Sequence, residues 1–78
     1  MNKARRKRIE EVMSRLEYLK DEVEGIMSEE QEAFDNMPEG LQQGPRGEAA
    51  ENAIASLESA HGQVDEAIGE LSTAMEAA

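Results

Sequence analysis

The chain has 78 residues, a formal net charge of −10, no cysteine, one tyrosine and one phenylalanine. This length allows one small domain, residues 1–78, and the lack of cysteine excludes disulfide bonds, thiolate nucleophiles and cysteine-ligated zinc. No apolar run approaches the ~20 residues of a membrane span, and no apolar signal segment follows the basic N-terminus. We therefore expect a cytoplasmic protein with no membrane partner, whose small aliphatic core gains stability by self-association.

Charge is unevenly distributed along the chain. Residues 1–20 carry a net charge of +4, and residues 21–78 carry a net charge of −14. The long acidic part would repel a DNA duplex lying along it, so we expect no direct binding of duplex DNA. The basic tip remains a candidate for a local anion site.

A first helix is predicted over about residues 3–35, because Asn2 is a suitable N-cap and apolar residues at helical spacing follow it. We expect this helix to end ahead of Pro38. Its apolar seam is predicted to contain Ile9, Val12, Leu16, Leu19, Val23, Ile26, Glu30 and Ala33. Three further residues should widen the stripe on one flank: Met13, Met27 and Phe34. Gly25 costs about 1 kcal/mol relative to alanine, which indicates a bend or a close contact.

The segment DNMPEGLQQGPRG, residues 35–47, interrupts the helical spacing. Its two prolines cannot sit inside a helix, because each lacks an amide hydrogen and its ring clashes one turn back. The segment therefore predicts a turn over residues 36–45. We expect the positive-φ positions of this reversal at three glycines: Gly40, Gly44 and Gly47.

A second helix is predicted over about residues 46–77, where apolar spacing resumes. Its seam should contain Ala50, Ile54, Leu57, His61, Val64, Ile68, Leu71, Met75 and Ala78. An alanine column that would let two helices approach closely recurs every seventh residue, at Ala53, Ala60, Ala67 and Ala74. Gly62 and Gly69 repeat the same interval, either as tolerated surface positions or as a second close helix contact in an oligomer.

The two seams match each other in an antiparallel arrangement. Leu16 faces Ile68 when facing residue numbers add to 84, and Leu19 faces Val64 when they add to 83. The sequence thus predicts an all-α fold, an antiparallel two-helix hairpin. Its apolar stripes are wider than one neighbouring helix can cover, so we expect a dimer that forms a four-helix bundle, or a higher oligomer.

Two polar residues occupy predicted seam positions. His61 lacks a nucleophile in a recognisable dyad, so we interpret it as a core position that fixes the register rather than as a catalytic base. Glu30 is expected to reach solvent near the turn or to pair with a partner chain. The scattered glutamates do not form the Glu-x-x-His pairs of a di-iron bundle, and no phosphate loop or catalytic triad is present. We therefore expect no enzymatic activity, no cofactor and no metal.

A basic block at the N-terminus is the charged feature that a solvated helix face does not explain: Lys3, Arg5, Arg6, Lys7 and Arg8. It either balances the acidic remainder or binds an anion, and cations are slightly unfavourable at a helix N-terminus. In an antiparallel dimer each tip would lie beside the turn of the other chain. That geometry predicts a composite nucleotide site. Its residues would be Arg5, Arg6 and Arg8 from one chain with Phe34, Asn36, Gln42 and Arg46 from the other.

The opening NKARRKRIEE, the junction EEQEAFDNMPEGLQ and the following RGE resemble short helical proteins from phages and prophages of Gram-positive bacteria. The resemblance covers nearly the whole chain, and AFDNMPEGLQ is its most specific part. The chain departs from the pattern at QQGPRG, where serine and further charges would be expected. The resemblance implies a phage accessory protein and brings no established activity or site residues with it.

Phage proteins of this size often interfere with host defence, which is an analogy at the level of the class. We therefore expect a non-catalytic protein that acts by binding in the host bacterial cytoplasm. It would inhibit a defence protein or sequester the nucleotide signal of that defence. The alternative is a structural, scaffold-like helical assembly protein of a phage. A third hypothesis is nucleic-acid mimicry, in which the acidic surface competes with DNA for a host protein.

Overall fold

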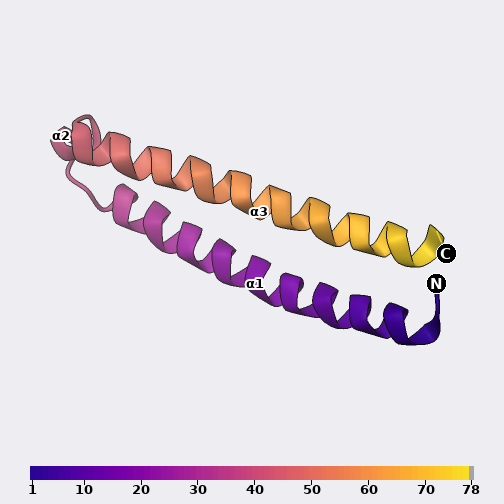
Figure 1. The fold of residues 1–78 in the computed structure, drawn as a ribbon. Coiled ribbons are helices and arrows are strands. Elements are labelled where there is room, and N and C mark those ends of the chain that lie inside the picture. The colour runs from indigo at the N-terminus through magenta and orange to yellow at the C-terminus, as the bar shows by residue number, and fades with distance from the viewer. Residues whose placement is uncertain (78) are drawn as a thin grey trace.

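The computed structural model describes residues 1–77 and contains three helices (Figure 1). These are α1 (Lys3–Asp35), α2 (Glu39–Gln42) and α3 (Pro45–Ala77). Within residues 1–77 there is no strand, so the all-α prediction is confirmed. Ala78, the last residue of the predicted second seam, lies outside the described residues.

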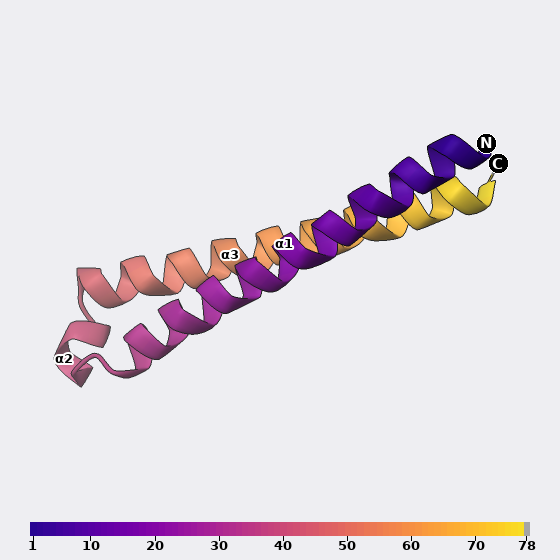
Figure 2. The same cartoon turned by 90° about the horizontal axis from the view of Figure 1, so that it is seen from below.

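The two long helices lie side by side and run in opposite directions (Figure 1). The N-terminus of α1 and the C-terminal end of α3 lie at one end of the rod, and α2 lies at the other. The described part of the chain measures 58 × 16 × 12 Å. The view turned by 90° shows that the two helices cross at a shallow angle (Figure 2).

The ends of α1 are set by two asparagines. The Asn2 side chain caps the helix by accepting a hydrogen bond from the Arg5 amide at 2.8 Å, as predicted. At the other end the Asn36 amide donates to the Glu32 carbonyl at 3.0 Å, with Asn36 in the right-handed helical region. The helix therefore ends without a left-handed residue.

The prediction that turn glycines supply positive φ angles is wrong, because no residue in the described part of the chain has a positive φ. The chain reverses through two corners on either side of α2, which the sequence did not predict. Gly47 serves a different purpose from the one predicted. A Cβ atom there would overlap the backbone carbonyl of Gln42 and lie 2.6 Å from its Cα. Gly47 is thus needed for the close approach of α2 to α3.

The seam predicted for α3 is confirmed for its described members. Ala50 and Ile68 are buried, and the others are half-buried: Ile54, Leu57, His61, Val64, Leu71 and Met75. Gly47, three residues before Ala50, is also buried and extends the seam to the first residues of α3. No residue of α1 is buried.

The seam of α1 differs from the prediction. Its half-buried residues are Ile9, Met13, Leu16, Lys20, Val23, Met27, Glu30 and Phe34. Val12, Leu19 and Ile26 are 41%, 48% and 54% exposed, so their placement in the seam, like that of the exposed Ala33, is wrong. The residues one position later take their places, among them Lys20.

The cross-helix contacts explain this choice of seam. Lys20 meets Asp65 and Glu24 meets His61, and both pairs of residue numbers add to 85. Lys20 faces Asp65 in this register and Leu19 is exposed, so the predicted layer of Leu19 with Val64 is also wrong. A lysine fits a seam position because its methylene stem covers apolar surface while its ammonium group reaches the edge of the helix pair.

Candidate functional site

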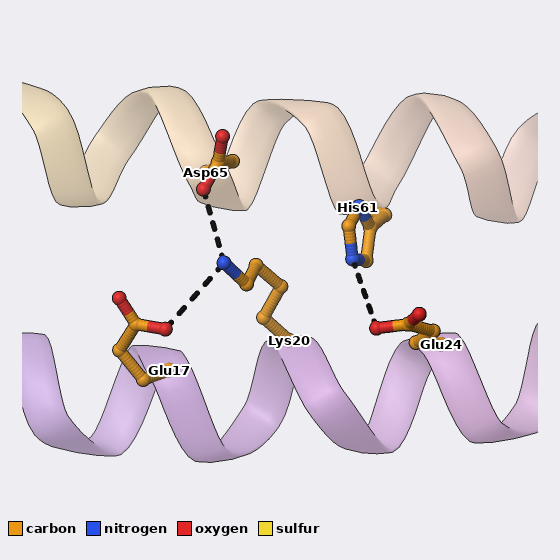
Figure 3. Close-up of polar contacts among 5 residues, drawn as sticks. All are labelled: Glu17, Lys20, Glu24, His61 and Asp65. Carbon is orange, nitrogen blue, oxygen red and sulfur yellow. Dashed lines mark hydrogen bonds and ion pairs between the residues drawn. The ribbon is translucent and has the colours of Figure 1, made fainter.

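A polar cluster crosses between α1 and α3 near the middle of the rod (Figure 3). Lys20 Nζ lies 3.1 Å from Asp65 Oδ1 and 3.4 Å from Glu17 Oε2. The hydrogen bond to Asp65 raises the pKa of Lys20 above its ordinary value, and partial burial opposes this rise. The Lys20 side chain is 19% exposed while its two acidic partners are more than half exposed. The cluster therefore keeps the ammonium group of Lys20 at the solvent-exposed edge of the helix pair, although the residue itself occupies a seam position.

His61 lies beside this cluster, and its environment fits a structural role. Its Nε2 atom is buried without a hydrogen-bond partner and lies 3.7 Å from Glu24 Oε2 (Figure 3). That distance is too long for a hydrogen bond, and the two groups form an ion pair when the imidazole is protonated. The sequence analysis did not predict this contact with Glu24.

One long side of the helix pair is acidic. Its residues come directly after every second seam residue of each helix, for example Glu17 after Leu16 and Glu58 after Leu57. We call this side the acidic face: Glu10, Glu17, Glu24, Gln31, Glu51, Glu58 and Asp65. The contacts of Asp65 with Lys20 and of Glu24 with His61 place the two helices' contributions on the same side. Two hollows on this side are lined by Gln31 and Glu58 together with neighbouring residues.

The opposite long side is apolar. Its residues come directly before the remaining seam residues, for example Val12 before Met13 and Ala67 before Ile68. We call this side the apolar face: Val12, Leu19, Ile26 and Ala33 of α1 with Ala53, Ala60, Ala67 and Ala74 of α3. In an antiparallel pair these two columns share a side, because the acidic columns share the other. Val12 and Leu71 of α3 line a common hollow there. The alanine column is thus outside the α1–α3 contact, and Ala74 alone among its members is half-buried.

The residues of the predicted composite site lie at opposite ends of the rod. Arg5, Arg6 and Arg8 are exposed on the first turns of α1. The other members lie around the turn: Phe34, Asn36, Gln42 and Arg46. Within one chain, the tip arginines and the turn residues are therefore separated by the length of the two long helices (Figure 1).

Two of the turn residues are joined to each other. Gln42 Nε2 donates a hydrogen bond to the Phe34 carbonyl at 2.9 Å, so this amide fastens α2 onto the end of α1. Arg46 lines a hollow with Glu30, Met37 and Leu41. Glu30 is half-buried and lines this hollow together with residues of the turn.

Two of the tip arginines border a surface hollow of about 290 Å³. Arg5 and Arg8 line it together with Ile9, Val12 and Leu71, while Arg6 does not. The walls are apolar and the bordering groups are cationic, so the hollow suits an apolar side chain that is accompanied by an acid. The sequence analysis placed its apolar residues in the two seams and did not predict a hollow between them.

In the part of the chain that the structure describes, no three His, Cys, Asp or Glu side chains are grouped as a metal ion would require. Among residues 1–77 no helix combines the length and the hydropathy that a membrane crossing needs. The chain matches no protein-family model, no curated protein and no solved structure.

Proposed function

We propose that this chain is a non-catalytic phage accessory protein that acts by binding, as a dimer of two-helix hairpins, against a component of bacterial defence. The observation that carries the binding role is the division of the rod into an apolar face and an acidic face. The resemblance to phage and prophage proteins of Gram-positive bacteria supports the setting, which is the cytoplasm of the infected host.

The dimer is proposed because one chain leaves too much apolar surface open. In residues 1–77 the buried residues are Gly47, Ala50 and Ile68. Meanwhile Val12, Leu19 and Ile26 are 41% to 54% exposed and recur along the same side. A contiguous exposed apolar patch of this kind marks an interaction surface. Two such faces packed together make a four-helix bundle with a shared core.

The acidic face would remain on the outside of that dimer. Its carboxylates are well exposed, with the Glu17, Glu24 and Asp65 side chains 54%, 59% and 65% accessible. A surface of one charge sign attracts a partner of the opposite sign and speeds their encounter. The target we propose is therefore a basic surface of a defence protein. Sequestration of a nucleotide signal would instead use tip and turn residues brought together from two chains.

The proposal is tested by plating a phage on host cells that carry a defence system active against it, with and without this chain. We expect expression of the chain to raise the efficiency of plating. The variant Glu51→Gln/Glu58→Gln, on the acidic face, should lose this effect. The matched control Glu22→Gln/Glu66→Gln removes the same charge outside that face and should retain it. Equal plating with and without the chain across a panel of defence systems would count against the function.

A scaffold-like assembly protein is the second candidate, and the 58 Å rod with an open apolar face favours it. In that case the apolar faces would join many chains rather than two. Light scattering over a hundredfold range of protein concentration separates the two functions. A mass fixed at two chains supports the dimer, and a mass that rises steadily with concentration supports the scaffold.

A further inference from the structure

We propose that the second copy lies antiparallel on the apolar face, with α1 against the partner's α1, so that the turn of each chain covers the tip hollow of the other. This inference rests on the proposed dimer and specifies its orientation. The occupant of the apolar face is thus another copy of the same chain, related by a two-fold axis across the middle of the rod.

Charge complementarity along α1 supports this orientation. Residues 1–8 contain five bases and no acid, whereas residues 28–39 contain five acids and no base. In the antiparallel arrangement each basic tip lies beside the partner's residues 37–44, which contain Glu39 and no base, and this happens once at each end. With the two-fold axis along the rod, both basic tips would lie at the same end, and each acidic segment would face the acidic start of the partner's α3.

The large residues of the apolar face are arranged so that they can pair with themselves. Val12, Leu19, Ile26 and Ala33 recur every seventh residue on one side of α1. In an antiparallel pair whose facing numbers add to 45, Leu19 meets the partner's Ile26 and Val12 meets the partner's Ala33. Every contact then occurs twice, as a closed two-fold interface requires.

The ends of the rod fit each other in the same arrangement. The tip hollow is lined by apolar side chains and bordered by Arg5 and Arg8. At the turn, Leu41 is 42% exposed and Glu39 lies in the same short helix. The partner's Leu41 would enter the hollow and the partner's Glu39 would lie beside the two arginines. The exposed leucine and the open hollow would thus cover each other.

Cross-linking of single-cysteine variants tests the orientation, since the chain has no cysteine of its own. Three variants are prepared: Val12→Cys, Ala33→Cys and Ala74→Cys. They are mixed in pairs, one member of each pair carrying a mass tag, and treated with a short bismaleimide cross-linker. We expect a tagged–untagged product from Val12→Cys with Ala33→Cys. A product from Val12→Cys with Ala74→Cys instead means that the tips share one end, which overturns the inference.

Light scattering on the same samples distinguishes the failure of this inference from that of the proposed function. A monomeric chain overturns the dimer itself. A dimer in which Val12→Cys and Ala33→Cys do not cross-link overturns the antiparallel orientation and leaves the dimer standing.

A charge exchange provides an independent measurement. Arg5→Glu/Arg8→Glu and Glu39→Lys should each weaken the dimer by roughly tenfold or more, because like charges then meet. One chain that carries all three substitutions should recover most of the affinity, since opposite charges face each other again. A combined variant that is as weak as either parent variant contradicts the inference.

Discussion

Lys20 of α1 reaches across the helix pair to Asp65 of α3, with its Nζ 3.1 Å from Asp65 Oδ1. The same lysine occupies a seam position where an apolar residue would bury more surface. The interaction therefore favours one alignment of the helices at some cost in core packing.

Replacement of Lys20 by methionine should stabilise the folded chain. Methionine keeps an unbranched apolar stem in the seam, and Asp65 is 65% exposed and remains hydrated without its partner. We expect a higher urea midpoint at pH 7 by circular dichroism. The matched control is Arg15→Met, which removes a charge from the exposed side of the same helix. A lower midpoint for Lys20→Met than for the control would show that the cross-helix contact outweighs packing.

Stability should fall at alkaline pH because of the same lysine. The hydrogen bond to Asp65 raises the pKa of Lys20 in the folded state above its value in the unfolded chain. The resulting stabilisation is fully present below the unfolded pKa and is lost as pH rises through the folded pKa. We expect the urea midpoint of the wild type to fall above pH 10.5 relative to Lys20→Met. Parallel curves for the two proteins from pH 8 to pH 12 would contradict this account.

Gly47→Ala should disrupt the junction between α2 and α3. The added Cβ overlaps the Gln42 backbone, which cannot move without displacing the turn. We expect a loss of about 1–3 kcal/mol in the free energy of unfolding. Gly44→Ala is the control, because its Cβ would lie 3.6 Å from the Gly40 carbonyl oxygen, an ordinary contact. Chemical denaturation of both variants makes the comparison, and an equal loss of stability in the two variants would contradict an overlap specific to Gly47.

Alanine at Gly62 and Gly69 should stabilise the chain by about 1 kcal/mol each. A Cβ atom at either position meets nothing within 4 Å in the chain. Thermal unfolding measures the gain, and light scattering on the same variants tests the alternative that these glycines form a close contact in an oligomer. Unchanged dimer affinity means that they are tolerated surface positions, and weakened affinity means that they lie in an interface.

Leu19→Glu should abolish dimerisation while leaving α-helical content nearly unchanged at low concentration. Leu19 is 48% exposed within one chain, so the substitution removes little packing between α1 and α3. In the dimer a carboxylate would be buried without a partner, and we expect affinity to fall by about a hundredfold or more. Tyr18→Glu is the control, because Tyr18 is 67% exposed and lies outside the apolar face. Sedimentation equilibrium measures both.

The seam residues of α3 could be predicted from the sequence, and those of α1 could be predicted only in part. On α3 one column is strongly apolar and its neighbours are alanine or acid, so the spacing has a single solution. On α1 the columns through Val12 and through Met13 both alternate correctly with Leu16. Hydrophobicity favours the first column because the second contains Lys20. The structure places the second column in the seam, with Lys20 bonded to Asp65, which is 45 residues away in the sequence.

The turn and the candidate site show a similar division. The prolines mark where the helices stop, but the function of Gly47 depends on how closely α2 approaches α3, which no local pattern records. Arg5 and Arg8 were identified as site candidates from charge alone. That they border a hollow follows from Leu71 on the other helix, so only the assembled pair could show it.

The packed turn prevents the two long helices from sliding past each other. A slide by one heptad moves α3 about 10 Å along α1 and leaves most aliphatic layers as well filled as before. In one direction it would bring Glu58 to Lys20 in place of Asp65, so this ion pair alone does not select the alignment. The turn selects it, because Gln42 is bonded to Phe34 and Gly47 packs on Gln42, which holds the start of α3 beside the end of α1. Each copy of the rod then presents the same lengthwise order of basic and acidic segments to whatever it meets.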